Sequence, residues 1–404
     1  MNSIAEEYVK LVLAVGRHDA DYVDAYHGPD AWRSQVEREK APLDAIQRAT
    51  ERTREKLAAL PLPSDGMEVL RYRFLQRQLE SLAARVALLS GATMTFDEES
   101  LALYDAVAPV LTEEHFQRTL NELNSLLPGK GSVADRYLAF KNHFIIQKDD
   151  LDSVFGAAIG ECRERTKKHI HLPADESFRV EYVNNKPWSG YNWFAGNYKS
   201  LIQVNTDLPI YIDRAIDLAA HEGYPGHHVY NTLLEQLMLK EKGWLEFSVY
   251  ALFSPQSLIA EGTANYGIEV VFSKEDRIIF ERDILFKLAK LTQSETNRYY
   301  KVHEVIGQLS YAGNEAARGY LNGTMTQSQV VDWLMQYALM ARERAEQRIK
   351  FFEKYRSYVI NYNVGQDMVK TYIEETCGAG ADHEKRWAEF TALIGSPRLP
   401  SQLK

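Results

Sequence analysis

Apolar residues recur at helical spacing along most of the chain. Near the N-terminus, Tyr8, Leu11, Val12 and Val15 are spaced so that all four lie on one face of a helix. This periodicity predicts a mainly α protein that begins with an antiparallel layer of helices over residues 1–175. The helical stretches are residues 4–60, 66–91, 112–126 and 132–170, with breakers at Gly28-Pro29, Pro61, Pro63 and Pro128-Gly129.

The apolar period changes from helical to alternating between residues 178 and 205. Phe178, Val180 and Tyr182 alternate with charged residues, and Ile202 and Val204 alternate with polar ones. Alternation places successive side chains on opposite faces of a strand. We therefore expect strands and a small β-sheet in this part of the chain.

Two predicted helices after these strands carry most of the candidate chemistry. The first begins near Pro209, with Asp207 as its N-cap, and its apolar face leads directly into His221. The second begins at Ser254-Pro255, because proline suits the first position of a helix, and it contains Glu261. Further helices are predicted over residues 274–311, 326–357 and 366–377.

The composition is that of an ordinary globular protein, and it excludes one class of function. The chain has 404 residues, of which 45% are hydrophobic and 25% charged, which is enough for one domain with a large core. The net charge of −9 argues against a nucleic-acid surface, since phosphate binding requires clustered basic residues. The basic run over residues 342–350 is interleaved with Glu343 and Glu346, so we interpret it as a solvated helix face.

Cysteines and apolar runs bear on the location of the protein. Cys162 and Cys377 are far apart and belong to no C-x-x-C pair, which excludes a zinc ribbon. No stretch approaches the roughly 20 apolar residues of a transmembrane helix. The N-terminal apolar run is too short, and too acidic in its flank, for a signal peptide. We therefore expect a cytoplasmic protein without a membrane partner, and its oligomeric state stays open.

A cluster of acidic residues near the N-terminus has a structural interpretation. Asp19, Asp21 and Asp24 lie beside His18 and His27. Their spacing lacks the glycine and the terminal glutamate of a calcium-binding loop. We interpret the cluster as a capped turn between helices.

The most informative run places histidines on both sides of a glutamate, and it reads His221-Glu222-Gly223-Tyr224-Pro225-Gly226-His227-His228. A zinc hydrolase needs imidazoles that converge on one ion and a carboxylate that takes a proton from water. In the HExxH pattern the second histidine follows the first by four positions, and Pro225 occupies that position here. The run therefore contains the right residue types at a different spacing.

The spacing leaves two candidates for the second histidine ligand. Because a helix advances about 100° per residue, a side chain at His227 points roughly 120° away from His221. His228 returns to the same face about 10 Å further along, so helical phase alone favours His228. Pro225 and Gly226 should bulge the helix and draw one of these two histidines back toward His221.

The run resembles the HExxPGHH signature of the DUF885 family, a largely uncharacterised bacterial group placed with the zincin-like metallopeptidases. Other blocks from about residue 180 onward are also similar to that family. Residues 200–205 with Pro209 match the approach to the motif, and residues 261–267 (EGTANYG) resemble its EGWALYGE segment. Arg356 with Tyr362 and Gly365 resembles its R…Y..G element.

The chain also departs from the family pattern. Thr263 stands in place of tryptophan, and Ile268 in place of an acid, with Glu269 one position later. Residues 298–318 lack the arginine, aspartate and histidine element of the family, so no role is carried onto His303 or Arg318.

The resemblance implies a zincin-like catalytic region over residues 176–404, packed with the N-terminal layer as one unit, with a small sheet beside the motif helix. It implies Zn²⁺ as cofactor and three ligands, which are His221, His227 (or His228) and Glu261. This set leaves a fourth position open, as catalytic zinc requires. Asn265 and Glu269 are candidates to orient the ligands.

The same resemblance implies roles in catalysis. Glu222 is expected to be the general base, and Tyr362 and Arg356 are candidates to stabilise an oxyanion or hold a substrate carboxylate. Residues 198–205 are expected to form the edge strand that holds a peptide. The predicted activity is zinc-dependent cleavage of short peptides. The alternatives are a hydrolase of a non-peptide amide or specialised metabolite, and a binding protein that retains the fold without activity.

Overall fold

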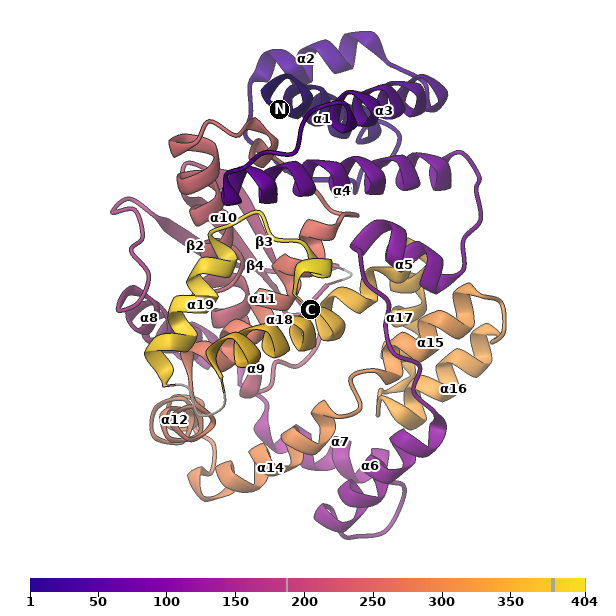
Figure 1. Cartoon of the computed structure of the whole chain (residues 1–404). Helices are drawn as coiled ribbons and strands as arrows, with labels where there is room; N and C mark the ends of the chain where they lie inside the picture. Colours follow the sequence, from indigo (N-terminus) through magenta and orange to yellow (C-terminus); the bar gives the residue numbers. More distant parts are fainter. Residues whose placement is uncertain (187, 379–381, 404) are drawn as a thin grey trace.

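Helices build most of the chain, which confirms the prediction of a mainly α protein (Figure 1). The computed structural model describes residues 1–186, 188–378 and 382–403. Before the sheet come α1 (Asn2–Val15), α2 (Asp30–Glu39), α3 (Leu43–Ala58), α4 (Gly66–Leu89), α5 (Phe96–Tyr104), α6 (Glu113–Leu126), α7 (Val133–Lys141) and α8 (Leu151–Lys167).

Eleven further α-helices and three π-helical segments follow the sheet within the described residues. The α-helices are α9 (Asp213–Leu218), α10 (His227–Leu233), α11 (Pro255–Val271), α12 (Lys274–Phe280), α13 (Phe286–Leu288), α14 (Thr296–Gly307), α15 (Ala312–Leu321), α16 (Gln327–Tyr337), α17 (Arg342–Tyr355), α18 (Ile360–Cys377) and α19 (His383–Ile394). The π-helical segments are η3 (Ala219–Gly223), η4 (Leu234–Glu241) and η6 (Glu281–Leu285). Among the described residues, no helix has the length and hydrophobicity of a transmembrane segment.

Three strands form the sheet beside the motif, in the order β2-β4-β3. Strand β2 (Ser177–Val183) pairs in parallel with β4 (Lys199–Asn205), and β3 (Gly190–Gly196) pairs with β4 in antiparallel orientation. The prediction that residues 198–205 form the edge strand was therefore wrong, because β4 has a neighbour on both sides. Sequence reasoning missed β3, whose adjacent Trp193 and Phe194 break the alternation of apolar and polar residues.

A second, two-stranded sheet was also missed. Strand β1 (Val23–Tyr26) pairs with β5 (Val249–Ala251) in antiparallel orientation. Both strands are short, and their pairing partners lie more than 200 positions apart in the chain. Local periodicity carries no signal for such a pair, so β1 was predicted as part of the first helical stretch.

The motif helix begins later than predicted. Residues 210–212 first bond to residues 144–146, with Ile146 N donating to Ile210 O at 2.8 Å, and α9 begins at Asp213. Asp207 caps no helix, and its carboxylate accepts instead from Asn185 N at 2.7 Å. The hydrogen bonds to residues 144–146 hold residues 210–212 out of the helix until α9 begins.

Helix α11 lies between the two largest hydrophobic cores. Ile259 packs in the core under the three-stranded sheet, and Leu258 packs in the core of the N-terminal helices. Helix α18 packs against α11 through Gly262 and Gly365, where a Cβ on Gly262 would lie 2.4 Å from Gly365 O. Glycine is required at this crossing because the two backbones touch. The crossing brings Tyr358, on the turn just before α18, next to Glu261.

Candidate metal centre

The HExxPGHH run is built from a π-helical turn and the start of a new helix. Segment η3 ends at Gly223, and α10 begins at His227. Gly226 N donates to Ala220 O at 2.9 Å, and a Cβ on Gly226 would lie 1.9 Å from His221 O. Only glycine fits this close return of the chain. The return places His227 beside His221, although six positions separate them.

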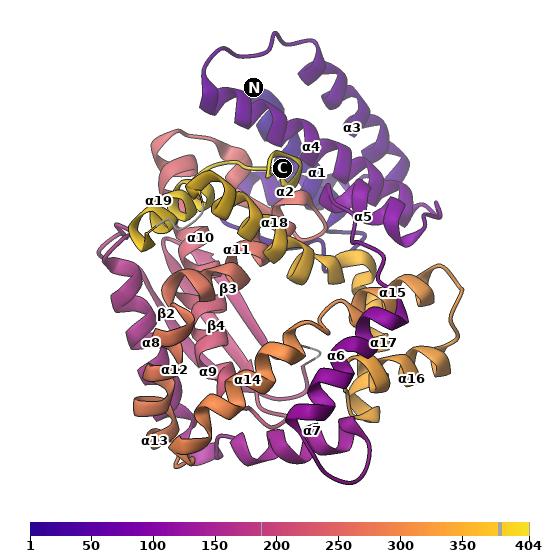
Figure 2. The same cartoon turned by 60° about the horizontal axis from the view of Figure 1, so that its bottom comes forward.

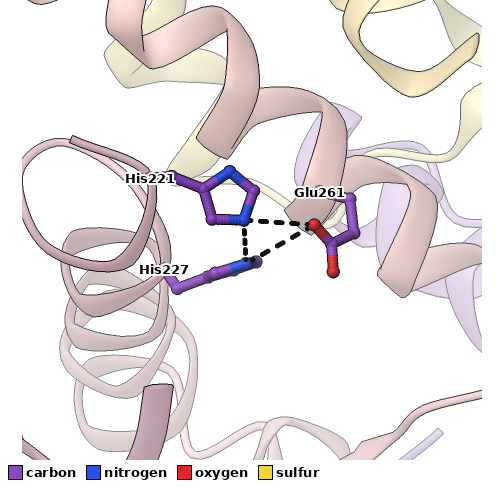
Figure 3. A group of neighbouring side chains, drawn as sticks. All are labelled: His221, His227 and Glu261. Carbon is purple, nitrogen blue, oxygen red and sulfur yellow. Dashed lines mark hydrogen bonds and ion pairs between the residues drawn. The ribbon is translucent and has the colours of Figure 1, made fainter. Parts of the chain in front are cut away.

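Glu261 on α11 completes a group of three side chains that point toward one another (Figure 3). The Nε2 atoms of His221 and His227 are 3.1 Å apart. Glu261 Oε2 lies 3.3 Å from His221 Nε2 and 3.7 Å from His227 Nε2. All three potential ligand atoms fall within 4.8 Å of one another, so a single ion could contact all of them.

The donor set fits a metal ion such as zinc. Glu261 Oε2 is buried and forms no hydrogen bond, although it faces both histidines. Buried polar atoms normally have a partner, so an unpaired carboxylate oxygen here needs an explanation. Two imidazole nitrogens and a carboxylate oxygen facing one point are a typical zinc donor set. The side chains of His221 and His227 keep 14% and 12% exposure, which leaves the group open to solvent.

The electrostatics of the group favour a cation. Burial lowers the pKa of His227, but contact with Glu261 and the charges of Glu222 and Asp24 outweigh burial and raise it to about 9. Burial raises the pKa of Glu261, but contacts with His221 and His227 hold it below its ordinary value. The carboxylates around His227 thus produce a negative potential at this point.

Asn265, one turn beyond Glu261 on α11, sets the orientation of the His221 ring. Its amide nitrogen donates to Tyr362 O at 2.8 Å, so the amide oxygen faces His221 Nδ1 at 2.9 Å. An amide oxygen only accepts, and His221 Nδ1 must therefore carry the proton. This tautomer leaves the lone pair of His221 Nε2 free for a metal ion. Glu269, by contrast, pairs with Lys370 at the surface, at 2.7 Å.

Sequence reasoning missed the partner of the second oxygen of Glu261. Tyr358 on the 3-10 turn before α18 donates its hydroxyl to Glu261 Oε1 at 2.8 Å. This bond fixes the carboxylate so that Oε2 faces the histidines. Tyr358 lies four positions before Tyr362, inside the R…Y..G block, and no spacing rule distinguishes it from the other tyrosines.

His228 lies away from the group and has other partners. It is fully buried, and its Nδ1 lies 2.8 Å from Ser200 Oγ on β4. Its Nε2 lies 3.0 Å from Glu176 Oε2, and Glu176 also binds Arg163 and Tyr224. Both ring nitrogens are therefore engaged in joining α10 to the sheet. The geometry brings His227, and not His228, to Glu261.

Glu222 lies one residue after His221 and is almost fully buried. Its backbone oxygen accepts from Asn192 Nδ2 on β3 at 2.7 Å. Its carboxylate lies against the start of β3, since a Cβ on Gly190 would be 3.0 Å from Glu222 Oε1. Glycine at this position leaves room for the carboxylate at the entry to the strand.

The two other predicted catalytic residues have different surroundings. Burial raises the pKa of the Tyr362 phenol, and the negative charges of Glu261 and Glu222 raise it further, so the phenol stays protonated. Arg356 Nε instead donates to the buried Glu99 at 2.6 Å, and Ser357 donates to the other oxygen of Glu99. The guanidinium thus joins the 3-10 turn between α17 and α18 to α5. Within the described residues, the contacts of His221, His227 and Glu261 do not include Arg356.

Sequence reasoning assigned Asp24, together with Asp19, to a capped turn. Asp19 fits that interpretation, because it accepts from Asp21 N at 3.2 Å and pairs with Arg85 at 2.5 Å. Asp24 accepts from the Tyr191 hydroxyl on β3 instead. Burial raises the pKa of Asp24 to about 6, with the charges of His227 and Glu261 also acting on it.

Comparisons with known proteins show a shared fold. No family model and no curated protein matches the sequence. The crystal structure of a "putative lipoprotein" from Colwellia psychrerythraea is similar, with a TM-score of 0.55 over 89% of this chain and 15% identity. This chain spans 65% of that protein's length. A "putative lipoprotein of unknown function" from Shewanella oneidensis covers 92% of this chain at 13% identity, with a TM-score of 0.49.

Proposed function

We propose that this protein is a zinc-dependent hydrolase, and that it acts as a metallopeptidase on short peptides. The observation that carries the proposal is the convergence of His221, His227 and Glu261 around a buried, unpaired carboxylate oxygen. Three protein ligands with an open position are typical of catalytic zinc, whereas structural zinc is closed by four. The general base expected of such an enzyme, Glu222, is adjacent to the first ligand.

The resemblance to the DUF885 family and to zincin-like enzymes supports the proposal. Its separate sequence blocks meet in space at one place. The first block supplies His221 and His227, the second supplies Glu261 and Asn265, and the third supplies Tyr362, whose carbonyl orients Asn265. If this place is the functional site, the blocks that resemble the family are expected to meet there, even though they are distant in sequence.

In the proposed reaction, the metal ion, Glu222 and Tyr362 have separate roles. Zinc, when bound, supplies Lewis acidity, which polarises a carbonyl group and lowers the pKa of water. Glu222 takes a proton from the attacking water and passes it to the leaving amine. The Tyr362 phenol remains protonated and is a donor for the developing oxyanion, a contribution of about 2–4 kcal/mol to the barrier.

A peptide substrate fits best along β3. Of the two edge strands, β3 lies beside Glu222 and contacts both η3 and α10. A peptide that adds to a strand edge is held by its backbone, independently of sequence. We therefore move the substrate position from β4, the strand favoured by the sequence, to β3.

The proposal is tested with Glu222→Gln. This variant should keep the stoichiometric zinc of the wild type, because its ligands are intact. Hydrolysis of a library of short peptides should fall by about 10²–10⁴-fold, the usual contribution of a general base. Zinc content is measured by elemental analysis and cleavage by mass spectrometry. Glu269→Gln at the surface is the matched control and should keep full activity.

Two results would contradict the proposal. If Glu222→Gln retains its zinc and cleaves every peptide at the wild-type rate, Glu222 is not the general base. If wild-type protein purified without chelators contains no stoichiometric metal, the group does not form a zinc site. A parallel screen of non-peptide amides and metabolites separates a peptidase from another amide hydrolase.

A further inference from the structure

One buried carboxylate contacts both ends of residues 225–227, the turn that carries His227 and that we call the ligand turn. Glu176 lies directly before β2, and its side chain is 1% exposed. Its Oε2 accepts a hydrogen bond from the Tyr224 hydroxyl at 2.6 Å and lies 3.0 Å from His228 Nε2. Tyr224 precedes the ligand turn, and His228 follows it. The same oxygen atom therefore holds the residues on both sides of the turn.

The second oxygen of Glu176 is bound by an arginine of α8. Arg163 Nη2 donates to Glu176 Oε1 at 2.6 Å, and Arg163 Nε donates to the Tyr224 hydroxyl oxygen at 3.2 Å. Burial raises the pKa of Glu176, but hydrogen bonds from its partners outweigh burial and lower the pKa to about 2, so the carboxylate is ionised and only accepts. Figure 2 shows α8 on the same side of the molecule as β2 and α10. Glu176 thus connects α8 and the start of β2 to the ligand turn.

Aromatic packing adds to these hydrogen bonds. The ring centroid of Phe178 on β2 lies 5.1 Å from that of Tyr224 and 5.2 Å from that of His228. The rings of Tyr224 and His228 are themselves 5.4 Å apart, edge to face. Gly223 leaves room for Phe178, since a Cβ on Gly223 would lie 3.0 Å from the Cζ atom of that ring. Both ends of the ligand turn are therefore packed as well as hydrogen-bonded, and closely packed interiors resist displacement.

The three candidate ligands differ in how their positions are fixed. Asn265 Oδ1 lies 2.9 Å from His221 Nδ1, and the Tyr358 hydroxyl donates to Glu261 Oε1 at 2.8 Å. The polar contacts of the His227 ring are with the two other ligands, at 3.1 and 3.7 Å. Among the described residues, no further side chain forms a hydrogen bond with this ring. The position of His227 therefore depends on the backbone of the ligand turn.

The start of α10 has few other attachments. Its N-cap is Gly226, which provides no side-chain cap. The first backbone N–H groups of a helix have no partner within that helix. A backbone hydrogen bond from Gly226 N at 2.9 Å holds the chain before His227. After His227, the ring of His228 makes the attachment, with Ser200 Oγ 2.8 Å from its Nδ1 and Glu176 at its Nε2.

We propose that Glu176 is a positioning residue of the metal centre. By binding Tyr224 and His228, it fixes the ligand turn between them and so holds His227 Nε2 beside the other two ligands. The role of His227 as a ligand rests on the proposed function. Residues that support a ligand without touching the ion change metal affinity by about 10–100-fold when they are replaced. Replacement of Glu176 should therefore affect metal binding as well as stability.

A buried ion pair elsewhere in the molecule provides the matched control. Glu246 is as buried as Glu176, and it binds Arg71 Nε at 2.6 Å. Within the described residues, Glu246 contacts none of the three candidate ligands. Glu246→Gln should therefore destabilise the fold, as any loss of a buried charge does, without altering the metal centre.

The first measurement is zinc affinity, by competition with a chelator of known affinity. Glu176→Gln keeps the size of the side chain but loses its charge and replaces an acceptor by a donor, so it should weaken zinc binding by about 10–100-fold. Tyr224→Phe keeps the ring and removes one donor to Glu176, so it should show a smaller loss. Glu246→Gln should keep the affinity of the wild type. Circular dichroism and urea unfolding show that each variant is folded.

A spectroscopic measurement separates a displaced ligand from a general loss of stability. Co²⁺ bound in place of zinc gives visible absorption bands that depend on the number and geometry of its ligands. The bands of Glu176→Gln should differ from those of the wild type, because His227 has moved. The bands of Glu246→Gln should coincide with those of the wild type. If Glu176 had only a structural role, its folded variant would also give the wild-type bands.

A crystal structure of metal-free Glu176→Gln gives a measure that needs no metal. In this variant, the Nε2 atoms of His221 and His227 should be farther apart than the 3.1 Å of the wild type. Tyr224→Phe is the smaller change and replaces Glu176→Gln in every measurement if the latter does not fold.

Folded Glu176→Gln with the zinc affinity and the cobalt bands of the wild type would overturn the inference. An equal loss of affinity in Glu246→Gln would also overturn it, since general destabilisation would then be the cause. If Glu176→Gln does not fold, wild-type affinity and bands in Tyr224→Phe have the same consequence.

Failure of the proposed function is a distinct result, because none of these measurements depends on turnover. If zinc binding depends on Glu176 as expected but the protein hydrolyses no peptide or amide, only the hydrolase is contradicted. If the wild type binds no zinc, the proposed function fails and the crystal structure decides the role of Glu176. An unmoved His227 then overturns the inference, and a displaced His227 supports it.

Discussion

Two groups of residues in this molecule have the composition of a metal site, and they differ in what occupies their centre. The first is His221, His227 and Glu261, and the second is Asp213, Asp217 and His303. In each group the potential ligand atoms lie within 4.8 Å of one another. Both contain histidine and carboxylate, and α9 with η3 connects them, because Asp213 begins α9 and His221 lies in η3.

The second group is closed by cations of the protein. Arg277 pairs with Asp217 at 2.8 Å and donates to Asp213 O at 3.2 Å, while His303 lies 3.2 Å from the Asp213 carboxylate. In the first group, no lysine or arginine of the described chain pairs with Glu261, and one of its oxygens has no hydrogen bond. The comparison teaches that residue type alone does not make a metal site. What distinguishes the two groups is an arginine, which pairs with a carboxylate of the second group and has no counterpart at Glu261 among the described residues.

The largest expected effect comes from removing Arg277, the arginine that pairs with the second group. Arg277→Met removes the cation of the buried Glu281 and the closer of the two cations of Asp217, which should lower the free energy of unfolding by about 3–5 kcal/mol. Urea unfolding followed by circular dichroism measures the loss. Arg282→Met, which removes an exposed pair with Asp283, should stay within about 0.5 kcal/mol of the wild type. A small loss in Arg277→Met would show that the second group does not depend on its cation.

A ligand change should separate the two groups by their metal affinity. Loss of residues that merely support ligands lowers metal affinity by about 10–100-fold, so Glu261→Gln should weaken zinc binding by about 100-fold or more. Asp217→Asn, in the second group, should leave zinc content unchanged. Competition with a chelator of known affinity measures both. Equal zinc affinity in Glu261→Gln and the wild type would mean that Glu261 is not a ligand.

The smallest expected effect is a pH dependence of the second group. Burial raises the pKa of Asp213, but His303 and Lys141 outweigh burial and hold it well below its ordinary value. A lowered carboxyl pKa stabilises the fold above the unfolded value, near pH 4, and this stabilisation is lost as pH falls toward the folded pKa. Between pH 6 and pH 3 the wild type should therefore lose about 1 kcal/mol more than Asp213→Asn. Chemical unfolding at several pH values tests this, and parallel pH profiles of the two proteins would contradict it.

Much of the helical fold was predictable because its signals are local. The start of α11 at Pro255 was predicted from a proline that suits the first helical turn, and β2 and β4 from side chains that alternate over a few residues. The break after Gly223 was expected from Pro225 and Gly226. The structure adds that a Cβ on Gly226 would collide with His221 O, so this glycine shapes the centre.

The parts that sequence reasoning missed depend on partners far along the chain. Strand β3 makes β4 central, although β3 itself lacks a regular alternation. Tyr358 binds Glu261 across 97 positions, and Asp24 meets Tyr191 across 167. The packing of helices and sheets brings these residues together, and no local sequence pattern predicts such contacts.

The sequence by itself determined that the chain is mainly helical and that His221, Glu222, His227, His228 and Glu261 are the residues to examine. These signals are periodicity, the positions of proline and glycine, and a short motif. Each depends on residues that are close together in the sequence, so each can be recognised without a structure. Only the tertiary structure decided that His227 faces Glu261 while His228 joins the sheet to Glu176, because the chain turns back at Gly226. It also decided that Arg348, in a basic run interpreted as solvated, is only partly exposed and has its guanidinium over the ring of Phe351 at 4.3 Å, because burial depends on which face of α17 packs against the protein.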